Sequence, residues 1–578
     1  MTHDLLRSIY GEESGRAAET QLRELMVRYA ARLPRPASSR TALSLTERDA
    51  LLITYADQVR TAGESPLRTL TDFARQHIQG VVSGIHLLPF YPWSSDDGFS
   101  VKDYFAIDPA LGDWSDVRQL GANFALMFDA VFNHMSVQGD WFQKFLRNDP
   151  SFRDFFVTVD GNPDLSRVVR PRALPLLTEF QTAGGPRKVW TTFSADQVDL
   201  NVCNPHVLLA LVEALLFYVE QGAKFIRLDA IAYLWKEIGT TCIHLPQTHE
   251  IIQLLRAVLD ELAPQVMLIT ETNVPHADNL SYFGNGTNEA QLVYNFALPP
   301  LVLHSLATGN AAKLTRWAQS LQLPSDRVTF FNFLASHDGI GLNPARGILS
   351  GAEIDALVQR AQDHGGFVSY KHNSDGSKSP YELNINYFDA LSNPAANEPL
   401  KTQIDRFICA QSIMLSLAGI PGIYFHSLFG SRGDRAGAEA SGIPRRINRQ
   451  KLDRVTVETE LATPSLRQSV FGLYKMLLEK RCLCPAFNPA ASQEVIASDD
   501  RVFAVLRTSS DGNSCALCLH NVSNESVSVR IQLPEHAARQ FQERKMLTGG
   551  AVARMLPPYE VHWIFTCARE ESGRVPGS

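Results

Sequence analysis

The sequence predicts an α/β protein built on a (β/α)8 TIM barrel, and three observations support this fold class. Eight short apolar runs alternate with amphipathic stretches of helical periodicity. Three of these runs stop at a carboxylate, which is typical of barrel strands whose C-terminal ends open onto an active-site rim. From residue 488 onward the texture changes to short β-rich runs, which indicates a small antiparallel domain. The predicted barrel strands are 51–56, 84–90, 123–131, 224–231, 266–272, 291–298, 328–337 and 422–428.

The remaining segments complete the predicted organisation. The first 48 residues keep helical apolar spacing, as in LLRSIYG and ETQLRELMVRYAARL. Two intervals between strands are too long for simple loops, and because both follow a strand end we expect them to stand over the same rim. The expected parts are a helical extension (1–48), the barrel (49–134, 205–338 and 394–487), two loop-insertion subdomains (135–204 and 339–393), the C-terminal antiparallel β domain (488–568) and a polar tail (569–578).

Composition narrows the function classes. The chain has 578 residues, 45% hydrophobic and 20% charged, with a net charge of −7, so no basic footprint for nucleic acid is expected. It has no run of about 20 apolar residues for a membrane span and no apolar leader at its acidic N-terminus. The eight cysteines are sparse, and the CxxC in CALC lies in a strand-like run, so we expect a reduced, cytoplasmic protein.

The three strand-end carboxylates are the candidate catalytic residues: Asp229 in KFIRLDAIAY, Glu271 in VMLITETN and Asp338 in FLASHDGIG. Arg227 precedes Asp229 by two residues, so both side chains should point the same way, and the arginine should lower the pKa of Asp229. Desolvation at the end of an apolar strand should raise the pKa of Glu271, as a general acid requires. Taken singly, these residues also suit a structural Arg–Asp pair and a turn aspartate.

A second polar group follows two other strands. The segment SSDDGFS supplies Asp96, Asp97 and Phe99, and FDAVFNH supplies Asp129, Asn133 and His134. Phe99 or Tyr233 could form an apolar platform under a sugar ring, with core packing as the alternative. A histidine at a strand end could bind a metal, but no HExxH or paired ligand spacing supports a metal site, and none is expected.

Four segments together resemble the signature regions of the α-amylase family of glycoside hydrolases: FDAVFNH, FIRLDAIAY, LITETN and ASHDG. The resemblance implies that Asp229 is a nucleophile, Glu271 the general acid/base and Asp338 a transition-state stabiliser. It also implies that Arg227, His134, His337, Phe193, Phe99 and Tyr233 hold a donor glucose.

Other segments resemble one branch of that family, the sucrose phosphorylases and their relatives: LLPFYPWSSDDGF, NFALPPLVLHSL, VVRPRALP and SPYELN. The resemblance implies that Arg172 contacts phosphate and that Tyr381 belongs to a mobile acceptor loop. It further implies that Asp96 and Arg445 form the pair that grips the glucose 4-hydroxyl and closes the donor site.

Two positions depart from the sucrose phosphorylases, which have histidine where this chain has Asn273 and glutamine where it has Glu382. With the ETNVPH context and the helical N-terminus, this pair resembles the glucosylglycerate phosphorylases. The resemblance implies a retaining phosphorylase that acts on an α-glucoside, phosphate and glycerate without a cofactor. The carboxylate of glycerate would need a cation, and Arg172 and Lys371 are the candidates.

Alternatives stay open from the sequence alone. The acceptor could instead be fructose, fructose 6-phosphate or glycerol, which would make the chain a sucrose, sucrose 6'-phosphate or glucosylglycerol phosphorylase. A plain hydrolase or transglucosidase is a further candidate, and an inactive amylase-like binding subunit belongs to a different class. The expected partners are small-molecule substrates, with neither nucleic acid nor membrane, and a homodimer is an open alternative.

Overall fold

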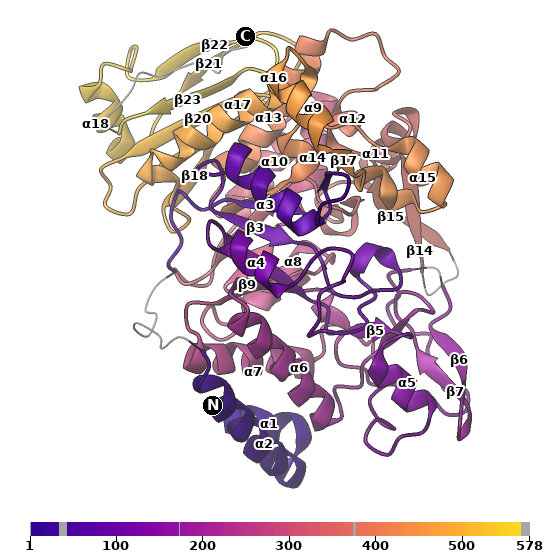
Figure 1. Cartoon of the computed structure of the whole chain (residues 1–578). Helices are drawn as coiled ribbons and strands as arrows, with labels where there is room; N and C mark the ends of the chain where they lie inside the picture. The colour runs from indigo at the N-terminus through magenta and orange to yellow at the C-terminus, as the bar shows by residue number, and fades with distance from the viewer. Residues whose placement is uncertain (1, 34–42, 173, 374–376, 568–578) are drawn as a thin grey trace.

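The computed structural model describes residues 2–33, 43–172, 174–373 and 377–567, and at its centre lies a closed barrel of eight parallel strands (Figure 1). Each predicted run supplies one strand, so the predicted barrel is confirmed. Around the barrel the order is β1-β16-β12-β11-β10-β9-β4-β3. The strands are β1 (Leu51–Thr54), β3 (Gly84–Leu87), β4 (Ala125–Ala130), β9 (Ala223–Leu228), β10 (Met267–Thr270), β11 (Leu292–Tyr294), β12 (Thr329–Phe333) and β16 (Ile420–Tyr424).

Helices between the strands cover the barrel, and their starts follow from local sequence. Asn204 caps α6 by accepting the backbone N–H of His206, and Pro205 fills the first helical position, where no N–H is needed. Asp113 and Asp116 form a reciprocal capping box at the start of α4. The larger helices are α3 (Pro66–His77), α4 (Trp114–Gly121), α6 (Pro205–Glu220), α7 (Pro246–Leu262), α9 (Leu298–Thr308), α10 (Ala312–Ser320), α13 (Leu400–Ser416), α16 (Arg454–Ala462) and α17 (Leu466–Cys482).

The N-terminal helices α1 (Thr2–Tyr10) and α2 (Glu12–Ala30) lie within the predicted helical extension, whereas residues 43–48 form coil and a turn. The two helices pack against α6 and α7, at the opposite end of the molecule from the C-terminal strands (Figure 1). The buried face of α2 includes Leu22, Leu25 and Tyr29, one stripe at helical spacing. No helix among the described residues combines the length and apolarity that crossing a bilayer requires.

Two long segments leave the C-terminal ends of β4 and β12. The first returns through β5 (His134–Ser136) paired with β8 (Gln197–Asp199), and it contains α5 (Asp140–Leu146) and the hairpin β6 (Leu177–Thr182) and β7 (Gly185–Trp190). The second holds β13 (Ile340–Gly341), α11 (Gly351–Asp363), the hairpin β14 (Phe367–His372) and β15 (Lys378–Asn384), and α12 (Tyr387–Leu391). Both segments supply residues to one pocket, as the position of the two strand ends predicts.

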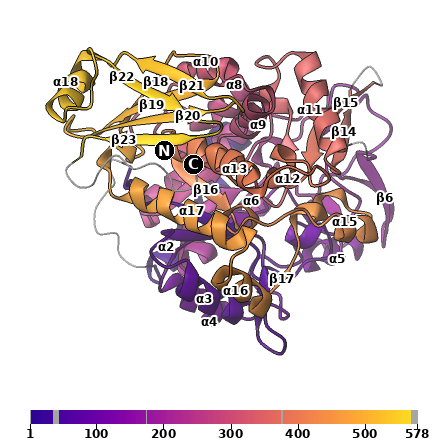
Figure 2. The ribbon, with the colours of Figure 1, turned by 90° about the horizontal axis from the view of Figure 1, so that it is seen from above.

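The C-terminal strands form two antiparallel sheets, as predicted, and lie to one side of the barrel (Figure 2). CALC lies in a strand, as expected. The sequence reading missed β22 and α18, and the polar tail lies outside the described residues. The elements are β18 (Ser492–Ile496), β19 (Val502–Thr508), β20 (Cys515–Asn521), β23 (Val561–Phe565), the ribbon β21 (Val527–Ile531) with β22 (Val552–Leu556), and α18 (Glu535–Glu543).

Two buried arginines join these strands to the barrel. Arg481, at the end of α17, and Arg507, in β19, are about as buried as apolar core residues. Their guanidinium groups donate hydrogen bonds to main-chain carbonyls of segments far apart in the chain. These carbonyls belong to Glu47, Asp49, Gly419 and Phe487 for Arg481, and to Ser416, Asn488, Ala491 and Ser492 for Arg507.

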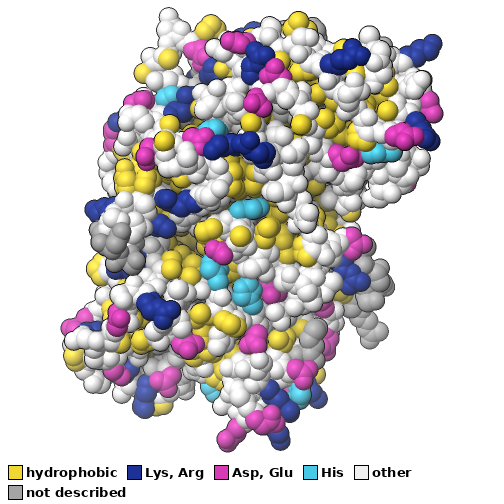
Figure 3. Space-filling model, turned by 180° about the vertical axis from the view of Figure 1, so that it is seen from behind, with side chains coloured by type: hydrophobic (Ala, Val, Ile, Leu, Met, Phe, Trp, Pro, Cys, Tyr) yellow, Lys and Arg dark blue, Asp and Glu magenta, His cyan; other side chains and the backbone are white. Residues whose placement is uncertain are grey.

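The outer surface carries mixed charge. Seen from behind, Lys and Arg side chains are interspersed with Asp and Glu, and neither sign gathers into a broad patch on this face (Figure 3).

Candidate active site

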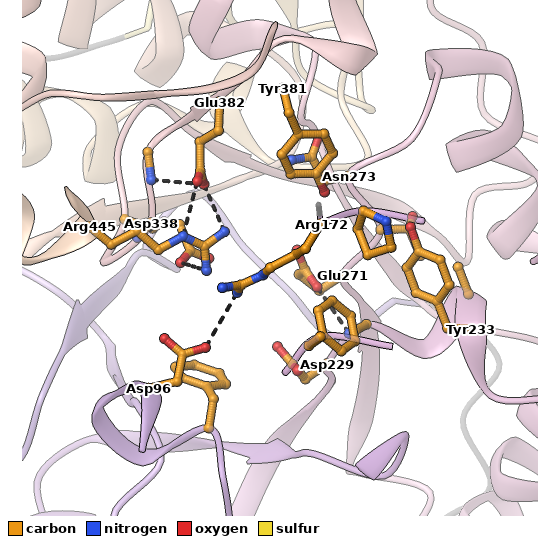
Figure 4. Close-up of a pocket in the computed structure, with 18 of the residues that line it drawn as sticks. Asp96, Arg172, Asp229, Tyr233, Glu271, Asn273, Asp338, Tyr381, Glu382 and Arg445 are labelled. Atoms are coloured by element: carbon orange, nitrogen blue, oxygen red, sulfur yellow. Dashed lines mark hydrogen bonds and ion pairs between the residues drawn. The ribbon is translucent and has the colours of Figure 1, made fainter. Parts of the chain in front are cut away.

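A pocket lies at the C-terminal ends of the barrel strands, where the predicted site residues meet (Figure 4). Fourteen of the fifteen predicted residues line it, and Arg227 lies beneath its floor. The lining residues are Asp96, Phe99, His134, Arg172, Phe193, Asp229, Tyr233, Glu271, Asn273, His337, Asp338, Tyr381, Glu382 and Arg445.

Arg227 organises the carboxylates at the floor. Parallel pairing places it in register with Asp129 of β4, and the two side chains form a close ion pair. Its Nη1 lies 2.8 Å from Oδ1 of Asp229, and its Nη2 lies 3.7 Å from Oε2 of Glu271. The contact with Asp229 confirms that the two-residue spacing turns both side chains the same way. One buried guanidinium therefore holds three carboxylates in place.

Burial raises the pKa values of two carboxyl groups at the floor, Asp229 and Glu271. Burial raises the pKa of Asp229, and the charges of Glu271 and Asp129 add to it and outweigh Arg227, so the predicted lowering is wrong. Burial also raises the pKa of Glu271, as predicted, although its Oε2 accepts a 3.0 Å hydrogen bond from the Ala230 N–H. Asp229 and Glu271 therefore both bind a proton more readily than an exposed carboxylate does.

Asp338 behaves in the opposite way. Burial alone would raise its pKa, but Arg445 and Arg449 hold it well below the usual range. The closest of these ion pairs joins Oδ1 of Asp338 to Nη1 of Arg445 at 2.9 Å. The pocket therefore lowers the pKa of Asp338 and raises the pKa values of Asp229 and Glu271.

Neutral rings line the donor side. Phe99 stacks on His337 with ring centroids 4.7 Å apart, and Phe193 packs against His134 and Tyr233. Burial lowers the pKa of His337 to about 3 and also lowers that of His134, so both imidazoles are neutral near pH 7. Flat apolar rings with neutral hydrogen-bonding groups suit a sugar ring better than a charged ligand.

The structure gives Asp96 and Arg445 other ion-pair partners than the predicted pairing of the two with each other. Asp96 lies 3.3 Å from Nη1 of Arg449 and 3.5 Å from Nη2 of Arg172, whereas Arg445 contacts Glu382 and Asp338. Arg449 follows the short helix η5 (Pro444–Asn448), is buried, and was missed by the sequence reading. The segment RRINR holds three arginines, and spacing alone gives no signal for which one reaches Asp96.

The predicted acceptor residues lie on the opposite wall. Nε and Nη2 of Arg445 each donate a 3.0 Å hydrogen bond to Glu382, which is 2% exposed, and the Gly339 N–H donates a third. The Oδ1 atom of Asn273 is buried and has no protein partner among the described residues. Lys371, a predicted candidate for the acceptor carboxylate, is not among the lining residues.

Two glycines, Gly339 and Gly341, let the backbone pack closely against the acceptor residues. A Cβ atom at Gly341 would lie 2.6 Å from Oδ1 of Asn273, and one at Gly339 would lie 2.4 Å from the Leu383 carbonyl oxygen. Strand β13, which contains Gly341, pairs with β15 opposite Glu382. The two acceptor-side residues are thus pressed together by backbone that leaves no room for a side chain. Among the described residues, no cluster of three or more His, Cys, Asp or Glu side chains could hold a metal ion.

Comparison with known proteins agrees with this geometry. Residues 77–340 match the family model described as the catalytic domain of alpha amylase. Three proteins named glucosylglycerate phosphorylase are 46–52% identical to the chain. The one from Allomeiothermus silvanus is 52% identical over 90% of this chain and 91% of its own length.

This chain belongs to the glucosylglycerate phosphorylase family. A sucrose phosphorylase from Agrobacterium vitis is more distant, at 31% identity over 79% of this chain and 91% of its own length. A crystal structure of sucrose 6F-phosphate phosphorylase from Thermoanaerobacter thermosaccharolyticum covers 90% of this chain and 100% of its own with a TM-score of 0.73. At 23% identity that structure supports the fold alone.

Proposed function

We propose that this chain is a retaining phosphorylase that reversibly converts 2-O-α-D-glucosyl-D-glycerate and phosphate into α-D-glucose 1-phosphate and D-glycerate. The observation that carries the proposal is the pair of carboxyl groups held by Arg227, those of Asp229 and Glu271, in a pocket lined by Arg172 and in a chain 52% identical to a glucosylglycerate phosphorylase. The pair supplies the nucleophile and the acid, and the arginine favours an anionic second substrate.

In the first step Asp229 attacks the anomeric carbon while Glu271 gives its proton to the departing oxygen. The bond from carbon to Asp229 forms, the glycosidic bond breaks, and glycerate leaves with the proton from Glu271. Contact of both carboxyl groups with one guanidinium suits the close spacing of a retaining enzyme. Because Asp338 stays ionised, it can stabilise the positive charge that develops on the sugar.

In the second step phosphate attacks the glucosyl ester from the side that glycerate left. The ester bond breaks, its electron pair returns to Asp229, and any proton lost from phosphate passes to Glu271. Two inversions give overall retention. Tyr381 and Arg172 are the proposed phosphate partners, and both line the pocket.

The donor subsite is proposed to hold one glucose unit. Asp96 lines the pocket and is held by Arg449, and we assign to Asp96 the contact with the glucose 4-hydroxyl. The rings of Phe99, Phe193 and Tyr233 would pack against the sugar. Arg445 belongs instead to the acceptor wall, where it fixes Glu382.

The proposed setting is the cytoplasm, with only small-molecule partners. All eight cysteines are free thiols, as in reduced compartments. Assembly as a homodimer stays a prediction, which light scattering of the purified chain would test.

The test is a synthesis assay with glucose 1-phosphate as donor and D-glycerate, fructose, fructose 6-phosphate or glycerol as acceptor. We expect phosphate release to be fastest with glycerate and the product to carry an α-linkage to the 2-hydroxyl by NMR. Preference for fructose would identify a sucrose phosphorylase, and release of glucose at the same rate without any acceptor would identify a hydrolase.

A further inference from the structure

The pocket is acidic, yet both substrates that reach its acceptor side are anions. Five carboxyl groups line it against two arginines, Arg172 and Arg445, and its two histidines are neutral. Like charges repel strongly where water is excluded. An anionic acceptor can therefore bind only where a cation has free donors.

Three arginines around the pocket are already held by carboxylates. Arg227 is engaged by Asp129, Asp229 and Glu271, and Arg449 by Asp96, Asp97 and Asp338. Arg445 directs Nε and Nη2 to Glu382 and Nη1 to Asp338. Each of these guanidinium groups already faces at least two carboxylates, so an added anion would meet net negative charge.

Arg172 differs from them. Its side chain is 32% exposed, and among the described residues its ion pair is a long contact of 3.5 Å with Asp96. Figure 4 shows the side chain crossing the open middle of the pocket, between Asp96 and Glu271. Among the described lining residues it is the cation with unused donors, in a fork suited to carboxylate or phosphate oxygens.

Both nucleophiles must present their charge at the same place. Phosphate and the acceptor hydroxyl attack one carbon from one side, so their attacking oxygens occupy one position. In phosphate the charged oxygens sit on the phosphorus next to the attacking oxygen. In a 2-hydroxycarboxylate the carboxylate is bonded to the carbon that carries the attacking oxygen, only one bond further away. In a 3-hydroxycarboxylate it lies further still.

We propose that the acceptor subsite takes 2-hydroxycarboxylates as a class, because Arg172 binds the acceptor carboxylate and phosphate in turn. The inference rests on the proposed phosphorylase function. When a 2-hydroxy acid attacks the glucosyl ester, its oxygen bonds to the anomeric carbon, the bond to Asp229 breaks and the hydroxyl proton passes to Glu271. Asn273 lines the same pocket, and its side-chain amide is the proposed hydrogen-bond partner of the 3-hydroxyl of glycerate. Lactate and glycolate lack that hydroxyl and should be weaker acceptors.

The first test is an acceptor series with the wild-type chain and glucose 1-phosphate. D-glycerate, lactate, glycolate, 3-hydroxypropionate and glycerol are compared by phosphate release and by NMR of the product. We expect lactate and glycolate to exceed 3-hydroxypropionate in kcat/KM by about tenfold or more, as expected for one charge-assisted contact. Equal use of 2- and 3-hydroxy acids overturns the proposal.

The second test removes the arginine. Arg172→Ala should lower the ratio of kcat/KM for glycerate over glycerol by about 10- to 100-fold and raise the KM for phosphate in the reverse reaction. Arg172→Lys should recover part of both. Arg170→Ala is the matched control, because Arg170 is in the same loop, bonds to the Leu174 carbonyl and does not line the pocket.

The outcomes separate the two proposals. A wild-type chain that uses glycerate, with a glycerate-to-glycerol ratio unchanged by Arg172→Ala, leaves the function standing and overturns the shared anion site. A wild-type chain that uses fructose in place of glycerate overturns the function, and with it the inference. Loss of phosphate affinity alone in Arg172→Ala means that the acceptor carboxylate is bound elsewhere.

Discussion

Arg449 beside the pocket and Arg481 beneath the C-terminal strands are both almost fully buried, but their partners differ. Arg449 contacts the carboxylates of Asp96, Asp97 and Asp338, and these charges outweigh burial and raise its pKa. Among the described residues, Arg481 and Arg507 donate to main-chain carbonyls, and burial lowers their pKa values to about 10 and about 9.

The difference separates two uses of a buried guanidinium. In the pocket, arginines and carboxylates fix one another, and what matters is which carboxylates remain charged. At the junction between the barrel and the C-terminal strands, each guanidinium donates hydrogen bonds to carbonyls that would otherwise be buried without partners. These hydrogen bonds hold distant segments together. Changes in the first set should alter chemistry, and changes in the second should alter stability.

The largest expected effect is on turnover in Asp229→Asn. An amide cannot form the glucosyl ester, so kcat should fall by about 10⁴-fold or more. Because the folded-state pKa of Asp229 is raised, its ionised form destabilises the fold, and this cost grows as pH rises above the unfolded value of about 3.9. The variant should therefore melt about 1–3 °C higher at pH 7.

Calorimetry at about pH 2.5 is the control, because this pH lies well below the unfolded value of about 3.9, Asp229 is then largely protonated in both states, and the difference should become small. A variant that melts lower at pH 7 would mean that Arg227 outweighs burial. Substantial remaining turnover would mean that the nucleophile is another residue.

The next largest effect concerns Glu271→Gln. Cleavage of the natural glucoside should fall by about 10³-fold, whereas α-glucosyl fluoride, whose leaving group needs no proton, should lose less than about tenfold. In the wild type the basic limb of the pH profile reports deprotonation of the pair, and because both pKa values are raised it should lie above the usual carboxyl range. With the fluoride, the variant should lack that limb. Equal losses on both donors would assign Glu271 a structural role.

A third prediction addresses the junction. Arg507→Met leaves the carbonyls that accept hydrogen bonds from this arginine without partners. It should therefore lower the free energy of unfolding by about 2–4 kcal/mol. Activity per folded molecule should be unchanged. The control is Arg501→Met, since Arg501 is 40% exposed and its ion pairs with Asp499 and Glu525 contribute about 0–1 kcal/mol. The free energy of unfolding is measured with urea. Similar losses of this free energy in both variants would show that the buried arginine is no more important for stability than the exposed one.

The smallest expected effect is on acceptor choice. Changing Asn273 to His and Glu382 to Gln together should lower the rate ratio of glycerate to fructose by about tenfold. Glutamine cannot replace both charged contacts from Arg445, and histidine removes the free Oδ1 acceptor. The measurement uses glucose 1-phosphate as donor. An unchanged ratio would show that acceptor choice depends on other lining residues.

The barrel and its catalytic carboxylates could be predicted because each signal is local. An apolar run ending at Asp229, Glu271 or Asp338 contains both the strand and its position at the rim. The direction of the pKa shift of Asp229 could not be predicted, because it depends on burial and on Asp129 and Glu271 from neighbouring strands as well as on Arg227.

Other features depend on where the backbone leads a side chain. Arg449 reaches Asp96 only because η5 turns the chain back over the pocket, and the sequence RRINR looks the same for each arginine. The carbonyl clusters of Arg481 and Arg507 come from segments far apart in sequence, which no periodicity reports.

The glycines of the acceptor wall limit how this pocket can change. Alanine at Gly341 would press on Oδ1 of Asn273, and alanine at Gly339 would meet the fixed backbone of Leu383. In a library aimed at new acceptors, variants at Gly339 and Gly341 would have distorted loops. A library that varies Asn273 and Tyr381 while holding both glycines keeps the loop in place and changes only the groups that face the incoming molecule.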